Sequence, residues 1–253
     1  MASDLELLVR DKYDGDASRV SEEDTTRLAA GEPLAYVIGW QPFLGLRIGL
    51  DSKPLIPRPE TEWWTELLIA HLREKFGDQP FAFLDLCAGS GAIGLSLLKS
   101  FPNARVSFGE LKAEHCEQIR KNIELNGLDA ARADIRESDL FAAFLQADGA
   151  PMRFDVIATN PPYIPEDREL DDSVAKYEPR EALFSGSDGL ALITSIANEA
   201  EAHLVSGGEL WMECDSSNAR SAQQLLADAD AARARLLDDL YGRPRLLVAY
   251  YGQ

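Results

Sequence analysis

The sequence predicts an α/β protein whose core is one largely parallel sheet with helices on both faces. From residue 81 onward, strand patterns alternate with helix patterns, which is typical of that architecture. A glycine-rich turn after one strand, and a strand that ends at two consecutive prolines, mark two candidate ligand-binding corners of the sheet. The 253 residues are enough for one large domain with a small appendage.

Short helices and a hairpin are predicted before this sheet. Helical patterns cover residues 5–13 and 21–30. Two apolar runs, 34–38 and 43–50, predict the strands of a β-hairpin. An amphipathic helix is expected to follow over 60–76.

Seven strands are predicted for the main sheet, each bounded by turn residues or a helix pattern. Their expected ranges are 81–87, 104–110, 131–135, 154–159, 208–214, 233–238 and 245–251. The last two strands lie too close together in the sequence for an intervening helix. One of them is therefore expected to run antiparallel to its neighbours.

A G-x-G-x-x-G set formed by Gly89, Gly91 and Gly94 stands between a predicted strand and a helix pattern. In that context the glycines permit positive φ and let a ligand approach the backbone closely. Glu110 ends the next predicted strand, where an acid can accept hydrogen bonds from ribose hydroxyls. A plain turn and a solvated carboxylate are the competing interpretations, and nicotinamide cofactors share this arrangement.

The four residues Asn160, Pro161, Pro162 and Tyr163 follow the apolar strand 154–159. The prolines end the strand, so the Asn160 side-chain oxygen and the Pro161 carbonyl can both face one pocket. Two fixed acceptors suit a planar nitrogen with two hydrogens, as in a glutamine amide or an adenine amine. A strand-ending turn, with Tyr163 as a core aromatic residue, is the alternative. S-adenosylmethionine (SAM) explains both this tetrapeptide and the glycine loop, because its methyl group would face the held nitrogen.

These motifs resemble the protein-(glutamine) methyltransferases of the HemK/PrmC type, which modify the Gly-Gly-Gln loop of class-1 peptide release factors. The resemblance runs from about residue 31 to residue 252. Its blocks are 31–39, 55–62, 160–163, 177–180, 188–190 and 239–245. It implies a Rossmann-like, seven-stranded class I SAM-dependent methyltransferase fold with one antiparallel strand, together with a short N-terminal helical segment and β-hairpin.

The resemblance also implies a set of site residues. The cofactor would lie across Asp85, Cys87, Ala88, Gly89, Ser90, Gly91 and Glu110, with its adenine near Asp139 and Leu140 and its methyl group near Asn160. Asn160, Pro161 and Tyr163 would be catalytic. The glutamine would contact Asn160, Pro161, Pro162 and Tyr163, with Arg58 and Phe43 in the pocket wall. No metal site is expected, because the three cysteines lack metal-type spacing.

Three segments are expected from the resemblance: a shortened helical segment over 1–30, a hairpin and active-site-covering segment over 31–58, and the catalytic domain over 59–253. Family members usually carry several N-terminal helices that contact the release factor. About thirty residues precede Gly31 here, enough for one or two helices. Recognition is therefore expected to depend mainly on the glutamine loop.

The charge of the chain bears on its partners. Its formal net charge is −18, from 43 acidic residues against 25 Lys and Arg, which argues against a nucleic-acid-binding surface. The acidic run 166–172 is either a solvated loop or a rim for a basic protein partner. No secretory signal or membrane-spanning stretch is apparent, so a cytoplasmic protein is expected. An adenine methyltransferase acting on DNA or RNA, and a non-catalytic SAM-binding protein, are the alternative functions.

Overall fold

A computed structural model describes residues 3–229 and 231–252 of the chain. Its centre is a seven-stranded sheet in the order β5-β4-β3-β6-β7-β9-β8. The strands are β3 (Ala82–Leu86), β4 (Arg105–Glu110), β5 (Ala133–Glu137), β6 (Phe154–Thr159), β7 (Leu204–Glu213), β8 (Arg233–Asp238) and β9 (Pro244–Tyr251). Because β9 pairs antiparallel with both β7 and β8 while the other pairs are parallel, the predicted single reversed strand is confirmed.

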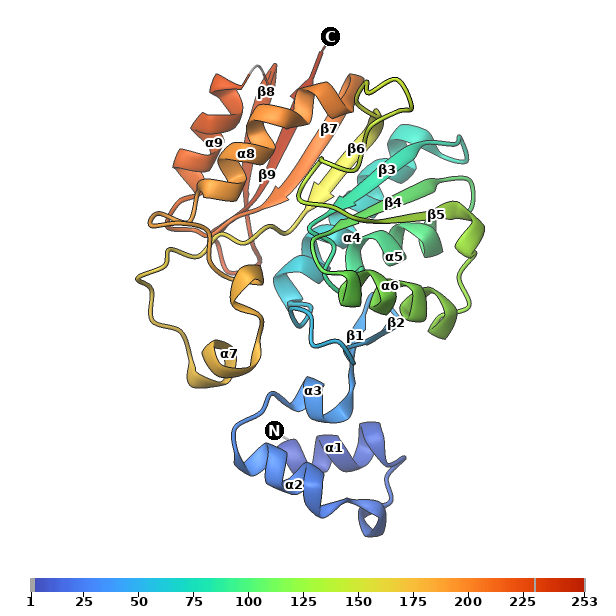
Figure 1. Ribbon diagram of the computed structural model, residues 1–253, viewed down its shortest axis with the longest axis vertical. Helices are drawn as coiled ribbons and strands as arrows, with labels where there is room; N and C mark the ends of the chain where they lie inside the picture. The colour runs from blue at the N-terminus through green and yellow to red at the C-terminus, as the bar shows by residue number, and fades with distance from the viewer. Residues whose placement is uncertain (1–2, 230, 253) are drawn as a thin grey trace.

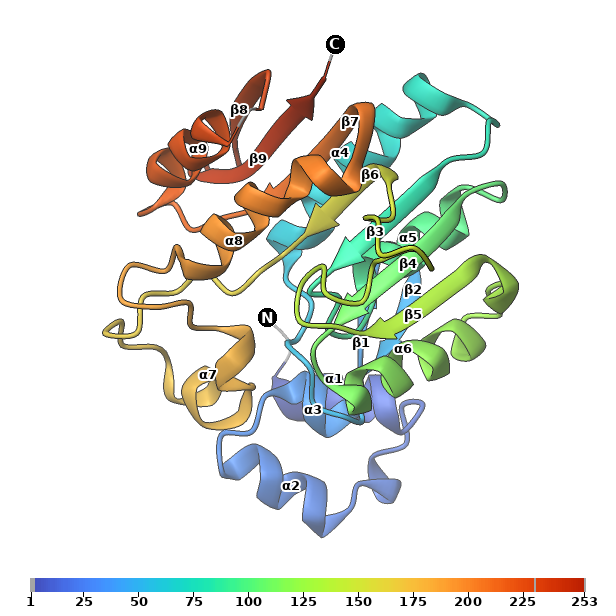
Figure 2. The same cartoon turned by 45° about the horizontal axis from the view of Figure 1, so that its top comes forward.

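Helices cover both faces of this sheet (Figure 1 and Figure 2). On one face lie α4 (Pro59–Phe76), α5 (Ala92–Ser100) and α6 (Ala113–Leu125), and on the other lie α8 (Ala191–Ala200) and α9 (Ala219–Asp228). Successive strand residues point to opposite faces. In β3, Phe83 therefore packs in the first hydrophobic core and Leu84 in the second.

The N-terminal part contains α1 (Asp4–Lys12), η1 (Ala17–Arg19), α2 (Glu22–Ala29) and α3 (Leu34–Ile38), which lie below the sheet in Figure 1. The prediction of a strand over 34–38 is wrong, because this run forms the helix α3. Pro33 stands at its N-cap, and Gly39 ends it in the left-handed conformation with φ 93°. A short apolar run has no clear period, so its helix and strand patterns look alike.

The hairpin is formed by β1 (Trp40–Phe43) and β2 (Leu46–Gly49), so it begins one element later than predicted. Its turn residues Leu44 and Gly45 both have positive φ. The hairpin packs on α6. At the end of that helix, the Asn126 side chain accepts the Arg47 N–H and donates to the Arg47 carbonyl. Asn122 of α6 also bonds the Gly49 backbone of β2, so the hairpin is anchored to this helix.

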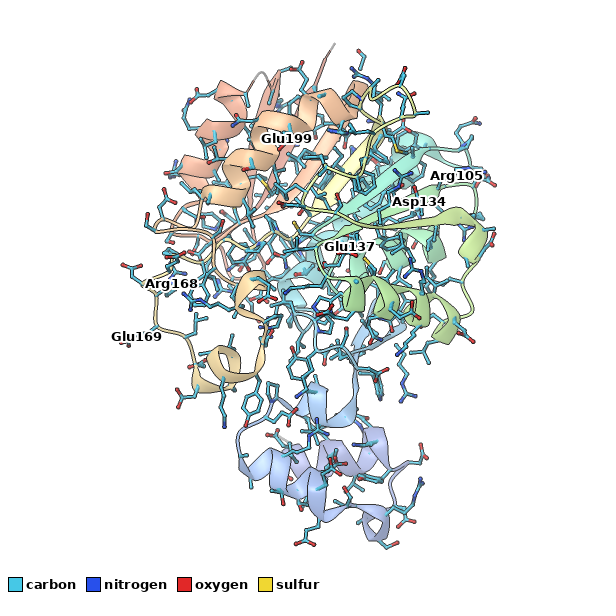
Figure 3. The ribbon with its side chains drawn as sticks, in the orientation of Figure 1. Arg105, Asp134, Glu137, Arg168, Glu169 and Glu199 are labelled. Carbon is cyan, nitrogen blue, oxygen red and sulfur yellow. The ribbon has the colours of Figure 1, made fainter. Side chains whose placement is uncertain are left out.

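A long connection from β6 to α8 contains α7 (Asp172–Tyr177) and the short helix η3 (Arg180–Ala182). The remaining short helices are η2 (Ala130–Arg132) and η4 (Glu201–His203). Figure 3 labels Arg168 and Glu169 on this connection, at the outer edge of the molecule. Arg168 forms an ion pair with Asp215 at 2.8 Å, whereas Glu169 is exposed. Within the described part of the chain, no helix has the length and apolar character needed to cross a membrane.

Candidate active site

The glycine loop joins β3 to α5 and is held in shape by Glu110. Gly89 and Gly91 have positive φ, which only glycine adopts without strain. Glu110 is 7 % exposed, and its two carboxylate oxygens accept the backbone N–H groups of Gly89 at 2.7 Å and Lys112 at 3.0 Å. A Cβ on Gly94 would lie 2.3 Å from the Phe108 ring, so the third glycine allows α5 to pack closely on β4.

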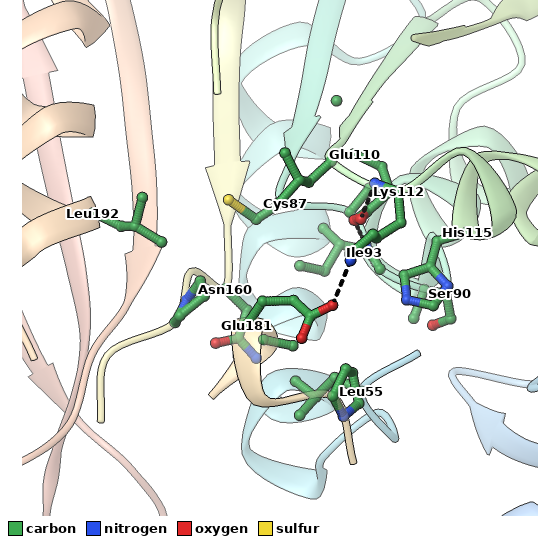
Figure 4. A pocket seen from close by; sticks show the side chains of 18 of the residues that line it. Leu55, Cys87, Ser90, Ile93, Glu110, Lys112, His115, Asn160, Glu181 and Leu192 are labelled. Carbon is green, nitrogen blue, oxygen red and sulfur yellow. Dashed lines mark hydrogen bonds and ion pairs between the residues drawn. The ribbon is translucent and has the colours of Figure 1, made fainter. Parts of the chain in front are cut away.

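A cavity of about 980 Å³ opens beside this loop, at the carboxyl ends of the strands (Figure 4). Eight of the ten residues predicted to hold the cofactor line it: Cys87, Ala88, Gly89, Ser90, Glu110, Asp139, Leu140 and Asn160. The fold therefore brings together predicted residues from four separate segments of the chain.

Asp85 and Gly91 are the two predicted cofactor residues that do not line the cavity. Asp85 is fully buried behind the loop, where one carboxylate oxygen accepts the Gly94 N–H at 2.8 Å. Burial raises the pKa of Asp85 well above its usual value. Gly91 caps α5 and donates its N–H to Ala88 at 2.7 Å. The structure thus gives both residues a contact that shapes the loop, in place of a contact with the cavity.

A second cavity of about 390 Å³ adjoins the first. Of the predicted substrate residues, Arg58, Asn160, Pro161 and Tyr163 line it, while Pro162 lines the first cavity. Asn160 lines both cavities, as do the apolar residues Leu55 and Ala182, so it is the polar residue at their junction. This is the position that a group contacting both a cofactor and a second substrate would occupy.

Polar side chains from three elements meet behind Asn160. The Asn160 Nδ2 amide donates to Thr61 Oγ1 at 3.2 Å, and that hydroxyl donates to Glu213 Oε2 at 2.7 Å. The Trp64 indole N–H also donates to Glu213 Oε2 at 2.7 Å, and the Tyr163 hydroxyl donates to Oε1 at 3.0 Å. Glu213 is 1 % exposed, and burial raises its pKa. One buried carboxylate therefore accepts three donors next to the tetrapeptide.

Comparison with known proteins identifies the family. A family model described as "Methyltransferase small domain" matches residues 60–177. The release factor glutamine methyltransferase of Lactococcus lactis subsp. lactis is 32% identical over 243 residues, covering 95% of this chain and 85% of that protein. The one from Cereibacter sphaeroides is 36% identical over 248 residues, covering 97% and 84%. The chain belongs to the release factor glutamine methyltransferase family. It is an enzyme, a methyltransferase.

Solved structures place this family member in a known fold. A methyltransferase from Pyrococcus furiosus superposes with a TM-score of 0.56 at 17% identity, covering 92% of this chain and 100% of that one. The 16S rRNA N2 G1207 methyltransferase of T. thermophilus, in complex with AdoMet and guanosine, gives 0.56 at 23% identity, covering 84% and 49%. The predicted Rossmann-like class I SAM-dependent methyltransferase fold is confirmed.

Two predicted wall residues of this methyltransferase have different surroundings. Arg58 lines the second cavity and forms an ion pair with the buried Glu178, which also accepts the Ile56 N–H at 3.2 Å. Phe43 lines neither cavity; it is 1 % exposed within the hydrophobic core. The expectation that the hairpin around Phe43 walls the glutamine pocket is therefore wrong, because that hairpin packs on α6.

The structure adds site residues that the sequence analysis did not single out. At the cavity in Figure 4, Lys112 forms an ion pair with Glu181 at 2.8 Å, and Glu181 comes from the connection that precedes α8. Behind Asn160, the new residues are Thr61, Trp64 and Glu213. Glu213 did carry a signal, because it is an acid inside the apolar run at the end of β7. Within residues 3–229 and 231–252, no cluster of His, Cys, Asp or Glu could hold a metal ion.

Proposed function

We propose that this enzyme transfers a methyl group from SAM to the side-chain amide nitrogen of a protein glutamine, in the Gly-Gly-Gln loop of a class-1 peptide chain release factor. The observation that carries this proposal is the position of Asn160, which lines both cavities. A methyl donor in the first cavity and an amide in the second would meet at this residue. The names of the related proteins support the choice of substrate.

The residues of the first cavity fit SAM. Glu110 is positioned for ribose hydroxyls, since each of its oxygens keeps a lone pair beyond the backbone bond that it accepts. Asp139 and Leu140 offer a carboxylate and an apolar side chain to the adenine, and the loop around Gly89 permits close approach of the remainder. When bound, SAM supplies an electrophilic methyl group on a sulfonium sulfur.

The second cavity would hold and orient the glutamine amide. Its nitrogen is a weak nucleophile, because its lone pair is shared with the carbonyl. The Asn160 side-chain oxygen and the Pro161 carbonyl would each accept one N–H and direct the nitrogen toward the first cavity. Preorganised acceptors of this kind act through orientation and electrostatics. As the new C–N bond formed, the bond between the sulfonium sulfur and the methyl carbon would break and leave S-adenosylhomocysteine, and the nitrogen would release one proton to water.

Among the residues that the structure describes, none that lines the second cavity is suited to act as a general base. The ionisable side chains in its lining are Arg58 and Tyr163. Arg58 is a cation paired with Glu178, and burial together with the charge of Glu213 raises the pKa of Tyr163 well above its usual value. Tyr163 therefore keeps its proton at neutral pH, and a guanidinium has no acceptor to offer, which agrees with a mechanism based on orientation.

The adenine alternative has less support. The formal net charge of −18 is unfavourable for a nucleic-acid substrate. A protein substrate with a basic surface would be attracted by the same charge. We place the enzyme in the cytoplasm, where release factors act. Segments 1–30, 31–58 and 59–253 remain our proposed division of the chain.

The test uses labelled SAM, a full-length release factor, the same factor with its Gly-Gly-Gln glutamine changed to alanine, and duplex DNA. Label is expected in the first protein alone. Asn160→Ala should lower turnover by roughly 100-fold or more while calorimetry shows largely retained SAM binding. Asn160→Asp should also fail, because it adds a charge beside the sulfonium. Label in DNA alone, or near-normal turnover in Asn160→Ala, would contradict the proposal.

A further inference from the structure

We propose that Thr61, Trp64 and Glu213 are positioning residues that fix which end of the Asn160 amide faces the substrate. This inference rests on the proposed function, because the Asn160 oxygen must be the end that accepts the glutamine N–H. An asparagine side chain can be turned over with little change in shape, and the turned form would offer a donor to a donor. Something in the protein must therefore set its orientation.

Trp64 fixes the donor and acceptor roles in this set of hydrogen bonds. Its indole N–H is a donor and has no acceptor capacity. It points at Glu213 Oε2 at 2.7 Å, and the Trp64 side chain is fully buried, so no water can take its place. Glu213, as a carboxylate, accepts at both oxygens. Oε2 is therefore fixed as an acceptor.

Thr61 transmits this direction to Asn160. Its hydroxyl lies 2.7 Å from Glu213 Oε2 and has a single proton, which it must donate to that carboxylate. The hydroxyl oxygen is then left with lone pairs for Asn160, 3.2 Å away. Only the Nδ2 end of the amide can donate to it. Among the residues that the structure describes, none donates to Asn160 Oδ1, so this oxygen remains for the substrate.

The Tyr163 hydroxyl completes the arrangement from the other side. It donates to Glu213 Oε1 at 3.0 Å, so one carboxylate fixes both ends of the tetrapeptide. The backbone at Tyr163 is also confined, since a Cβ on Gly189 would lie 2.2 Å from the Tyr163 carbonyl oxygen. Glu213 is at the end of β7 and Thr61 is in the first turn of α4. The orientation of Asn160 therefore depends on two elements outside its own loop.

The experiment compares Thr61→Val, which removes the hydroxyl at nearly constant shape, with Thr61→Ser, which keeps it. Thr65→Val is the matched control, because Thr65 is equally buried one turn later in α4 and bonds the Thr61 backbone carbonyl at 2.7 Å. Thr61→Val is expected to lower kcat by about 10-fold or more. Thr61→Ser and Thr65→Val should stay within about 3-fold of wild type, and SAM affinity should change little in all three.

A second measurement needs no protein substrate. In 15N-labelled enzyme, the side-chain NH2 signals of Asn160, assigned with Asn160→Asp, should show one hydrogen-bonded proton. That feature should be lost in Thr61→Val and regained in Thr61→Ser. An Asn160 signal that is unchanged in Thr61→Val, or a changed signal with normal kcat, would overturn the inference. If wild-type enzyme fails to methylate the release factor, the proposed function falls, while the amide signals still test the hydrogen bonds.

Glu213→Gln distinguishes this arrangement from a general need for charge. Because Trp64 requires an acceptor, the new amide should place its oxygen toward Trp64 and Thr61 and its nitrogen toward Tyr163. Thr61 would still donate, so kcat is expected to remain within about 5-fold of wild type. Glu213→Leu, with no acceptor, should fall as far as Thr61→Val. Equal losses in Glu213→Gln and Glu213→Leu would overturn the inference.

Discussion

Replacing Glu110 by glutamine tests how the cofactor cavity is built. The Glu110 carboxylate accepts the Gly89 N–H at 2.7 Å and the Lys112 N–H at 3.0 Å. A glutamine side chain has the same shape but only one acceptor oxygen. Its NH2 end would face one of the two backbone donors, so that donor would lose its partner at a site where Glu110 is 7 % exposed.

The expected loss follows from the cost of an unpaired buried group. Leaving one buried N–H without an acceptor costs about 1–3 kcal/mol. In the variant, the loop would relax to pair this N–H with water and would have to regain its shape to bind SAM, so that amount is subtracted from the binding free energy. SAM affinity should then fall by about 5- to 150-fold. Glu110→Ala removes both acceptors and the proposed ribose contact, so its loss should be at least as large.

Isothermal titration calorimetry with SAM measures this effect directly. Glu137→Gln is the matched control, because Glu137 pairs with Glu110 in the sheet register, ends the neighbouring strand β5 and lines neither cavity (Figure 3). Its SAM affinity should equal that of wild type. Thermal unfolding without SAM separates loop effects from global destabilisation. Unchanged SAM affinity in Glu110→Ala would remove Glu110 from the ribose role and refute the reasoning.

Two further predictions concern ion pairs. Glu181→Gln breaks the ion pair with Lys112 at the first cavity. Because both side chains are partly exposed, the rate of SAM dissociation measured by stopped flow should rise only about 2- to 5-fold. The rise should be smaller at high salt, which screens the pair in the wild type. Glu32 forms ion pairs with Arg27 and Lys53, and the Arg27 guanidinium above all lowers the pKa of Glu32 from 4.5 to about 2. This carboxylate therefore stabilises the fold above about pH 4.5 and stops doing so as the pH falls toward 2. Glu32→Gln should lower Tm at pH 7, and an equal difference from wild type at pH 2 would contradict the assignment.

Much of the fold could be predicted, because strand and helix periods differ over long segments. The strand over 154–159 was predicted with the bounds of β6. The start of β7 was predicted at residue 208, whereas the strand begins at Leu204. The glycines at 207 and 208 resemble a turn, and Gly207 indeed has positive φ, yet the strand continues through it. In short segments with an ambiguous period, such as 34–38, tertiary contacts decide between helix and strand.

The site was predictable where one short segment carries its own chemistry. In the glycine loop and in residues 160–163, the glycines and prolines themselves indicate the backbone geometry. The family resemblance assigned Asp85 to the cofactor, but its side chain points behind the loop to Gly94. Glu213 was missed because its partner Thr61 lies 152 residues away in the chain. A buried acid is recognisable in a sequence, but the donors that satisfy it are not.

The tetrapeptide alone does not determine the substrate, since its two acceptors suit an adenine amine as well as a glutamine amide. Discrimination must come from the other walls of the second cavity. Those walls come from 55–58, 164 and 174–183, and among the described residues Tyr163 is the single aromatic one in the lining. Enzymes that act on a flipped base hold it between stacking side chains. The hydroxyl of Tyr163 is tied to Glu213, and apolar aliphatic residues make up most of the remaining wall. A cavity of this kind suits the methylenes of an extended glutamine side chain better than the two faces of a purine.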